Sequence, residues 1–437
     1  MAELRGLPGF RDFYPEDLAV RSHIIDVWRD VARRYGFVEF DGPPLEPLEI
    51  YTKKSGSEIV AQLYQFEDKG GRRVALRPEM TPTLVRMVGA RARALPKPIR
   101  WFSVPQLYRY ERQQRGRLRE HFQLNVDILG ETDVLADAEL LAVAIEVVRA
   151  LGLSPNHVRA RVSDRRLLGA MFRRVGVAED QLLAVYHVVD RLGRESEESL
   201  AGRLEKLGLD RAAIEHIFAL TRLSGIDQLH AEFGDVEGVS EVVGELSTYL
   251  SCLENLGVRD YVDIDLSIVR GLAYYTGIVF ELWDAGRELR AICGGGRYDD
   301  LLQALTGVDM PALGFGMGDV VLAELLRERG LLPEYRSGID CYVVAIGDEA
   351  RGEALKLAAE LRGAGFSTAF DFAMRSPKAQ FKSADQMGAR WAVVIGPEEL
   401  AAGRALIRDM GRGHERAVDR ERVVPELREV STVDSDG

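Results

Sequence analysis

The sequence predicts an α+β protein: an antiparallel sheet with flanking helices and a helical insertion, followed by a smaller α/β domain. Residues 122–128 and 262–268 alternate strictly between apolar and polar side chains, which is typical of half-buried antiparallel strands. Residues 165–256, between them, show helical periodicity with charged faces. We therefore expect a first domain over residues 1–325 with an insertion at about 165–256, a linker over 326–337, and a second domain over 338–437.

The individual elements support this division. Apolar residues at helical spacing over 16–35 predict a helix that ends at Gly36, and residues 135–151 predict a second one. After the linker, strands at 339–347, 366–372 and 390–396 alternate with helical segments. This rhythm predicts a small domain with a largely parallel sheet.

Composition restricts the class of protein. No apolar run reaches the roughly 18 residues that span a bilayer, so we expect no membrane segment and a cytoplasmic location. The three cysteines, Cys252, Cys293 and Cys341, lie far apart, so we expect neither a disulfide framework nor a structural metal site. The net charge of −12 argues against a nonspecific cationic coat but does not exclude a local RNA-binding patch.

An arginine-rich segment precedes the first alternating strand. It centres on Gly116 and contains Arg109, Arg112, Arg115, Arg117 and Arg119. Such a loop can bind phosphates through bidentate contacts, or it can be a solvated hairpin. In the following strand Gln123, Asn125 and Asp127 share one face, which either meets water or lines a polar pocket.

Four other segments are candidates for a binding site. Residues 270–281 contain Arg270, Tyr274 and Tyr275, although adjacent tyrosines also occur in cores. Glycines at 294–296 and 314–318 permit close approach of a ligand to the backbone, or form turns. Their spacing matches neither a Walker motif nor a dinucleotide fingerprint. Glu79 is either a pocket carboxylate or an exposed acid at a helix start.

In this order, the segments resemble those of histidyl-tRNA synthetases, which are class II aminoacyl-tRNA synthetases. RGLAYYTGIVFE (270–281) resembles the histidine-specific signature, and GGGRYDDL (294–301) a second one. Residues 108–130 look like class II motif 2, GFGMGDVVL (314–322) like motif 3, and 381–396 like part of the anticodon-binding domain. The resemblance implies a class II antiparallel catalytic sheet, an anticodon-binding second domain and a homodimer formed near residues 7–50.

The resemblance also implies residue roles in joining histidine to tRNA(His) with ATP and nucleotide-bound Mg²⁺. Arg109 and Arg270 would be catalytic and contact ATP, together with Gly294, Gly295 and Gly316. Histidine would contact Glu79, Thr81, Gln123, Asp127, Tyr274 and Tyr275. The acceptor end of the tRNA would meet Arg112, Gln114 and Arg115, and the anticodon would meet residues 339–431, with Lys378, Gln380 and Lys382 as candidates.

Two positions depart from the family pattern. Val321 stands where motif 3 normally has an arginine for the ATP γ-phosphate, and Arg112, Arg117 or Arg119 could supply that charge. Ala273 replaces a frequent aspartate in the histidine signature. Two other functions are therefore weighed: a catalytically silent paralogue, such as the regulatory subunit of ATP phosphoribosyltransferase, and a tRNA-sensing module without ligase activity. Retention of the second domain, the polar strand and Arg109 favours the ligase.

Overall fold

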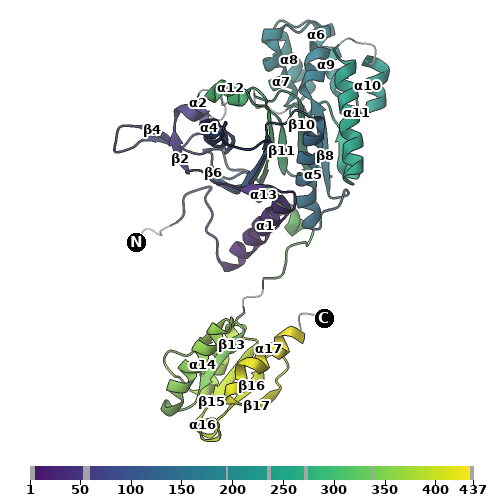
Figure 1. Ribbon diagram of the computed structural model, residues 1–437. Helices are drawn as coiled ribbons and strands as arrows, with labels where there is room; N and C mark the ends of the chain where they lie inside the picture. The colour runs from purple at the N-terminus through teal and green to yellow at the C-terminus, as the bar shows by residue number, and fades with distance from the viewer. Residues whose placement is uncertain are drawn as a thin grey trace. The chain divides into compact units, whose positions relative to one another are not determined.

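A computed structural model describes residues 5–52, 60–192, 195–233, 238–269, 274–335 and 338–433. The chain forms two compact units, Met1–Pro333 and Glu334–Gly437 (Figure 1). The division falls inside the predicted linker, although α13 (Asp319–Glu328) extends past residue 326, where that linker was expected to begin. In the described residues, no helix is both long enough and apolar enough to cross a membrane.

The first unit is built on a mixed, mainly antiparallel sheet with the order β1-β5-β7-β12-β11-β10-β8-β9, and β6 also pairs with β7. Its strands are β1 (Val38–Glu39), β5 (Ile99–Ser103), β6 (Gln106–Tyr108), β7 (Glu120–Leu129), β8 (Val158–Asp164), β9 (Val262–Ile264), β10 (Ile278–Asp284), β11 (Cys293–Arg297) and β12 (Ala312–Gly318). The predicted strand at 122–128 is confirmed as β7, which is antiparallel to β5 and β12. The predicted α+β fold class is also confirmed.

The second alternating segment, 262–268, was predicted wrongly as an antiparallel strand. Its strand, β9, ends at Ile264 and runs parallel to β8. Asp265 ends it, because its carboxylate accepts the backbone N–H of Ser267 at 3.0 Å and its carbonyl accepts that of Ile268 at 3.1 Å, which turns the chain. Arg161 pairs with Asp265 at 3.1 Å, so the alternation in this segment reflects ion pairing with β8 as well as burial.

Helices cover both faces of this sheet. The apolar face of β7 packs with α1 (Pro15–Arg34), α5 (Val134–Ala150) and α11 (Ser240–Asn255) in one large core. On the opposite face, α4 (Thr81–Arg91) and α12 (Leu301–Thr306) pack over Leu129 and neighbouring apolar residues. Gln123, Asn125 and Asp127 share that second face by alternation, so they point to the area beside α4 and α12.

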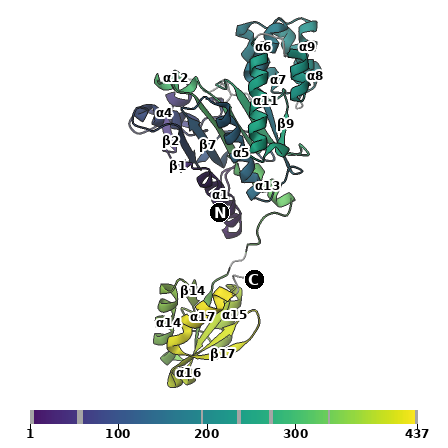
Figure 2. The same ribbon diagram turned by 45° about the vertical axis from the view of Figure 1, so that its right-hand side comes forward.

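The remaining elements of the first unit are a helical insertion and a small sheet. Between β8 and β9 the chain forms α6 (Arg165–Arg174), α7 (Leu182–Val189), α8 (Glu197–Lys206), α9 (Arg211–Thr221), α10 (Ile226–Phe233) and α11. Figure 1 shows α6 to α10 gathered beyond one end of the sheet, and Figure 2 shows α6 to α9 there in the turned view. Helix α11 packs along α5. Near the other end, a small antiparallel sheet has the order β2 (Leu45–Pro47), β4 (Arg73–Leu76) and β3 (Gln65–Glu67), and α2 (Glu49–Thr52) follows β2 in the chain.

The second unit has a sheet with the order β14-β13-β15-β16-β17. Its elements are β13 (Cys341–Ala345), α14 (Arg351–Gly363), β14 (Thr368–Phe370), α15 (Pro377–Gln386), β15 (Trp391–Ile395), α16 (Pro397–Ala402), β16 (Arg404–Asp409), β17 (Glu415–Asp419) and α17 (Val423–Val433). Strands β14, β13 and β15 are parallel, but β16 and β17 are antiparallel. The three predicted strands are thus parallel, as expected, whereas β16 and β17, which the sequence did not predict, add two antiparallel pairings to the sheet.

Gln380 is a buried structural residue of this unit, which its polar side chain did not indicate in the sequence. Its side chain is fully buried and bonds the end of β13, accepting from the Ala345 N–H at 2.9 Å and donating to the Ala345 carbonyl at 2.7 Å. It therefore does not face solvent as an anticodon contact would. Lys378 and Lys382, on the same helix, are exposed.

Candidate active site

Two adjoining cavities lie on the polar face of β7. The inner cavity, of about 70 Å³, has Arg109, Gln123, Gly294 and Gly316 in its wall. The outer cavity, of about 880 Å³, has the same four residues in its wall, so the two spaces meet there. Arg109 is held at this junction by a hydrogen bond from its Nε to the carbonyl of Pro78 at 2.9 Å.

The inner cavity combines a buried carboxylate with three tyrosine rings. Glu79 is 5% exposed and accepts a hydrogen bond from the Tyr274 hydroxyl at 3.4 Å, so it is not the exposed helix-start acid of the alternative interpretation. The Tyr274 ring lies 5.1 Å from that of Tyr275 and 5.8 Å from that of Tyr298. The wall is completed by Thr81, Asn125, Gly314 and Phe315. The cavity therefore suits a small cationic group, which could pair with the Glu79 carboxylate and contact the faces of the tyrosine rings.

Asp127 lies behind this wall and does not itself line either cavity. It accepts a hydrogen bond from the Tyr298 hydroxyl at 2.5 Å, and Tyr298 does line the inner cavity. Burial raises the pKa of the Asp127 carboxyl to about 7, although the Tyr298 hydroxyl acts in the opposite direction. Asp127 therefore acts on the cavity through Tyr298, which was not among the residues predicted from the sequence.

Glycines in β12 make room for the polar face of β7. A Cβ added at Gly316 would lie 2.8 Å from the Gln123 side chain, and one at Gly314 would lie 2.0 Å from a carboxylate oxygen of Asp127. Gly294 and Gly316 line both cavities, as predicted for ligand-facing glycines. Gly295 lines neither cavity. A Cβ added at Gly295 would lie 2.5 Å from the carbonyl oxygen of Gly314, so this position faces the neighbouring strand. Its lack of a side chain serves strand packing.

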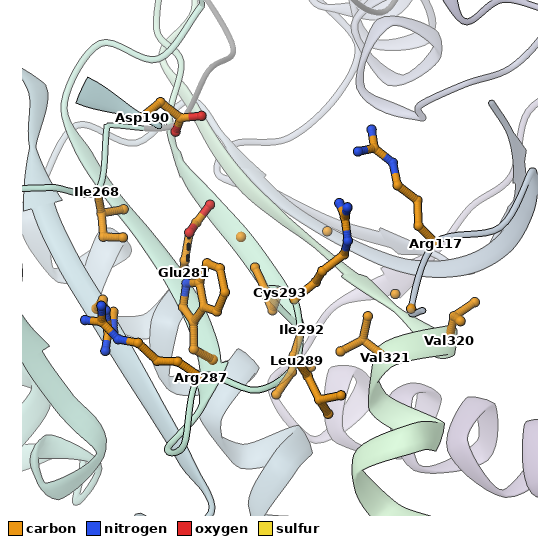
Figure 3. A pocket seen from close by; sticks show the side chains of 18 of the residues that line it. Arg117, Asp190, Ile268, Glu281, Arg287, Leu289, Ile292, Cys293, Val320 and Val321 are labelled. Atoms are coloured by element: carbon orange, nitrogen blue, oxygen red, sulfur yellow. Dashed lines mark hydrogen bonds between the residues drawn. The ribbon is translucent and has the colours of Figure 1, made fainter. Parts of the chain in front are cut away.

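The outer cavity is rich in arginine. Figure 3 shows Arg117 on the side of Val320 and Val321, with Glu281, Arg287 and Asp190 across the opening. Further guanidinium groups in the wall are those of Arg109, Arg161, Arg191 and Arg290. Glu281 accepts a hydrogen bond from the Trp283 indole N–H at 2.9 Å. Clustered guanidinium groups around a hollow of this size suit a polyanionic ligand.

The arginine-rich loop folds onto α13. Arg115 pairs with Glu324 and Glu328 of that helix, and Arg290 donates to the side-chain oxygen of Gln114. Arg117 pairs with Glu111, and the Arg119 guanidinium lies 4.1 Å from the centre of the Tyr110 ring. Arg112 is exposed. Of the five arginines, Arg109 and Arg117 reach the outer cavity.

Burial and the nearby guanidinium of Arg109 lower the pKa of His121 to about 3. This imidazole, which lines the outer cavity, is therefore neutral at physiological pH and adds no positive charge to it.

The structure thus brings most of the predicted residues together. Glu79, Thr81, Gln123, Tyr274 and Tyr275 line the inner cavity with Arg109. Arg270 and Ala273 lie outside the described residues, but Ile268 borders the outer cavity and Tyr274 the inner one. Sequence reasoning missed Tyr298, although it stands inside the quoted segment 294–301, and Arg290, for which no motif gave a signal. Within the part of the chain that is described, no three His, Cys, Asp or Glu side chains are grouped as they would be to hold a metal ion.

Comparisons with known proteins cover nearly the whole chain. The family described as "Histidyl-tRNA synthetase" matches residues 9–319, and "Anticodon binding domain" matches residues 340–430. The chain is 43% identical to the histidine–tRNA ligase of Opitutus terrae, over 99% of this chain and 100% of that protein. It is 39% identical to the chloroplastic/mitochondrial histidine–tRNA ligase of Arabidopsis thaliana, over 93% of this chain and 83% of that protein.

A solved structure gives the same result. The crystal structure of histidyl-tRNA synthetase from Nostoc sp. PCC 7120 superposes with a TM-score of 0.81 at 27% identity, covering 98% of this chain and 100% of that one. Fold and cavity together define a class II aminoacyl-tRNA synthetase. Within that class, the chain belongs to the histidyl-tRNA synthetase family. The predicted family and the predicted aminoacyl-tRNA ligase activity are confirmed.

Proposed function

We propose that the chain activates histidine with ATP to form histidyl-adenylate and transfers the histidyl group to the 3′ end of tRNA(His), using the two adjoining cavities. The observation that carries this assignment is the junction at Arg109, where a small carboxylate-and-tyrosine cavity meets a large arginine-lined one. An amino acid in the first and a nucleotide in the second would meet at one guanidinium group.

Histidine would occupy the inner cavity. The Glu79 carboxylate attracts its ammonium group, and Thr81 and Gln123 offer hydrogen-bonding atoms to its backbone. Tyr274 and Tyr275 would shape the imidazole site. Tyr298, which its hydrogen bond to Asp127 orients, would support that site. A pocket that hydrogen-bonds a polar side chain rejects analogues lacking that group by factors on the order of 10⁴ or more.

ATP would occupy the outer cavity, with Gly294 and Gly316 allowing its approach. The histidine carboxylate attacks the α-phosphorus, the bond from that phosphorus to the bridging oxygen breaks, and pyrophosphate leaves. Negative charge builds on the phosphoryl oxygens during this step, and Arg109 stabilises it. We propose Arg270 as the second such donor, since the residues that flank its segment border both cavities. Mg²⁺ carried by the nucleotide would neutralise phosphate charge when bound, and the carboxylates of Glu111 and Glu281 in the cavity wall fit such an ion.

In the second step each unit would contact the tRNA. The terminal ribose hydroxyl attacks the adenylate carbonyl, and AMP leaves. Arg112, Gln114 and Arg115, on the loop that folds over α13, are the proposed contacts of the acceptor end. The second unit would bind the anticodon, with the exposed Lys378 and Lys382 as candidate phosphate contacts.

We further propose a homodimer and a cytoplasmic location. Leu7, Tyr14 and Val38 in the N-terminal segment are 70%, 65% and 62% exposed, and a partner surface there would cover them. Analytical ultracentrifugation tests the dimer: a single monomeric species at micromolar concentration would exclude it. The free cysteines agree with a reducing compartment, and cell fractionation tests the location.

The decisive experiment is ATP–pyrophosphate exchange measured with each of the twenty amino acids, followed by charging of tRNA(His). We expect exchange only with histidine. Val321 is the observation that favours the regulatory paralogue as a second candidate, since it stands where a phosphate-binding arginine is expected. A purified, folded chain without histidine-dependent exchange would favour that paralogue, and exchange without tRNA charging would overturn the second step.

A further inference from the structure

Position 321 lacks the positive charge that the family resemblance predicts there. Val321 is 7% exposed and lines the outer cavity from the first turn of α13. An apolar side chain at this point leaves the corresponding end of a triphosphate without a cation. Either the cavity binds ATP more weakly, or a side chain from another element supplies the charge.

The segment that leads into β11 runs beside position 321. Cys293 pairs with Met317, and the Gly318 N–H donates to the carbonyl of Ile292 at 3.2 Å. The residues just before Ile292 therefore lie next to the residues between β12 and α13. Arg290 is two residues before Ile292, and it lines the outer cavity with Val321.

A second measurement joins the two positions. A Cβ built on Gly116 would lie 3.1 Å from Cγ2 of Val321 and 4.0 Å from Cδ of Arg290. A single atom position thus lies close to both side chains, so the two side chains are neighbours. Since the Arg290 guanidinium extends beyond Cδ, it can reach the part of the cavity that an arginine at position 321 would reach.

The arginines of the loop are held differently. Of Arg112, Arg117 and Arg119, which the sequence offered as substitutes, Arg117 lines the outer cavity and the other two do not. Arg117 pairs with the Glu111 carboxylate, whose side chain is 6% exposed. Arg290, in contrast, donates from Nη2 to the amide oxygen of Gln114. Arg290 also differs from Arg117 in its place, because it comes from the segment that lies beside Gly318 and Val321.

We propose that Arg290 binds the γ-phosphate of ATP in place of the arginine missing at position 321. The inference rests on the proposed function, because it assigns ATP to the outer cavity. The positive charge that is missing at position 321 would then come from a residue of the β10–β11 connection and not from α13.

Direct binding tests the assignment without turnover. Isothermal titration of the full chain with Mg·ATP and with AMP, in the absence of histidine, compares a ligand that has a γ-phosphate with one that lacks it. We expect Arg290→Ala to weaken ATP binding about 10- to 100-fold, as for a lost charge-assisted hydrogen bond, and to leave AMP binding within about twofold. Arg290→Lys should retain part of the ATP affinity because it keeps the charge.

A matched control removes an equal charge nearby. Arg327→Ala changes an exposed arginine on α13 that lines neither cavity, and its ATP affinity should equal that of the parent. Introducing Val321→Arg into the Arg290→Ala variant should recover at least about fivefold in ATP affinity. Equal weakening of ATP and AMP would point to a distorted cavity, and undiminished ATP affinity to another cation. Either result, or no recovery in a folded double variant, would overturn the assignment.

The outcome is separable from that of the proposed function. If the parent chain binds ATP but shows no histidine-dependent exchange, the ligase proposal fails while the difference between ATP and AMP still reports on Arg290. If the parent exchanges pyrophosphate with histidine and Arg290→Ala keeps its ATP affinity, the assignment of Arg290 alone fails.

Discussion

Replacement of Asp127 by asparagine should change how the stability of the first unit depends on pH. Burial raises the pKa of this carboxyl from its usual 3.8 to about 7 in the folded chain. The folded state then holds a proton that the unfolded state releases, so Asp127 favours folding fully at low pH. That contribution is lost as the pH rises from about 4 through about 7.

The size of the effect follows from the two pKa values. Between pH 5 and pH 8, the unfolded carboxyl is almost fully ionised while the folded one passes through its pKa. With about 1.4 kcal/mol per pKa unit, the free energy of unfolding should fall by about 2–3 kcal/mol over this range because of Asp127 alone. Asp127→Asn cannot titrate and should lack this component.

Urea denaturation of the parent and of Asp127→Asn at pH 5, 6, 7 and 8 measures the difference. Subtracting the two profiles cancels the other titrating groups, among them Asp137 and Asp319, whose pKa values burial also raises. The transition of the first unit must be analysed separately, since the chain has two compact units. Parallel profiles for the two proteins would refute the reasoning, because some other group would then carry the pH dependence.

Three further predictions concern the junction, the glycine wall and the second unit. Arg109→Ala should lower the rate of histidine-dependent pyrophosphate exchange about 10²- to 10³-fold at saturating substrates, with the unfolding midpoint as control; an unchanged rate would remove Arg109 from the mechanism. Gly316→Ala places a methyl 2.8 Å from the Gln123 side chain and should raise the KM for histidine, whereas Gly244→Ala, which meets open space, should not. Gln380→Leu leaves two buried backbone groups of β13 without partners and should lower the stability of the second unit by about 2–4 kcal/mol, measured by urea denaturation; a smaller loss than in Lys378→Leu would contradict this.

The sequence predicted what depends on local periodicity. Strand β7 was found because its alternation reflects one apolar and one polar face, and α1 because its apolar residues repeat at helical spacing. Segment 262–268, which pairs with β8, misled the prediction, because Asp263 and Asp265 alternate for ion pairing with Arg159 and Arg161, and Asp265 ends the strand. Alternation alone does not distinguish these causes.

The site was predictable where a motif carried it and not where distant segments meet. Glu79 and the two tyrosines came from resemblance, and the cavity unites them. Asp127 came with them, but its position behind Tyr298 depends on the pairing of β7 with β12, which no local pattern encodes. The place of Arg290 in the cavity wall could not be predicted for the same reason, since its neighbour Val321 is 31 residues away in sequence. Gln380 looked like a surface amide because Lys378 and Lys382 stand two residues away from it on either side.

The bare backbone at Gly294 and Gly316 limits how this enzyme can change over evolution. These two residues stand in the walls of both cavities, and at Gly316 even one methyl group would press on Gln123. New substrate preferences cannot readily arise from that side. They would have to come from the tyrosine ring cluster or from the helix start at Thr81, where side chains already stand and can be exchanged for others of similar volume.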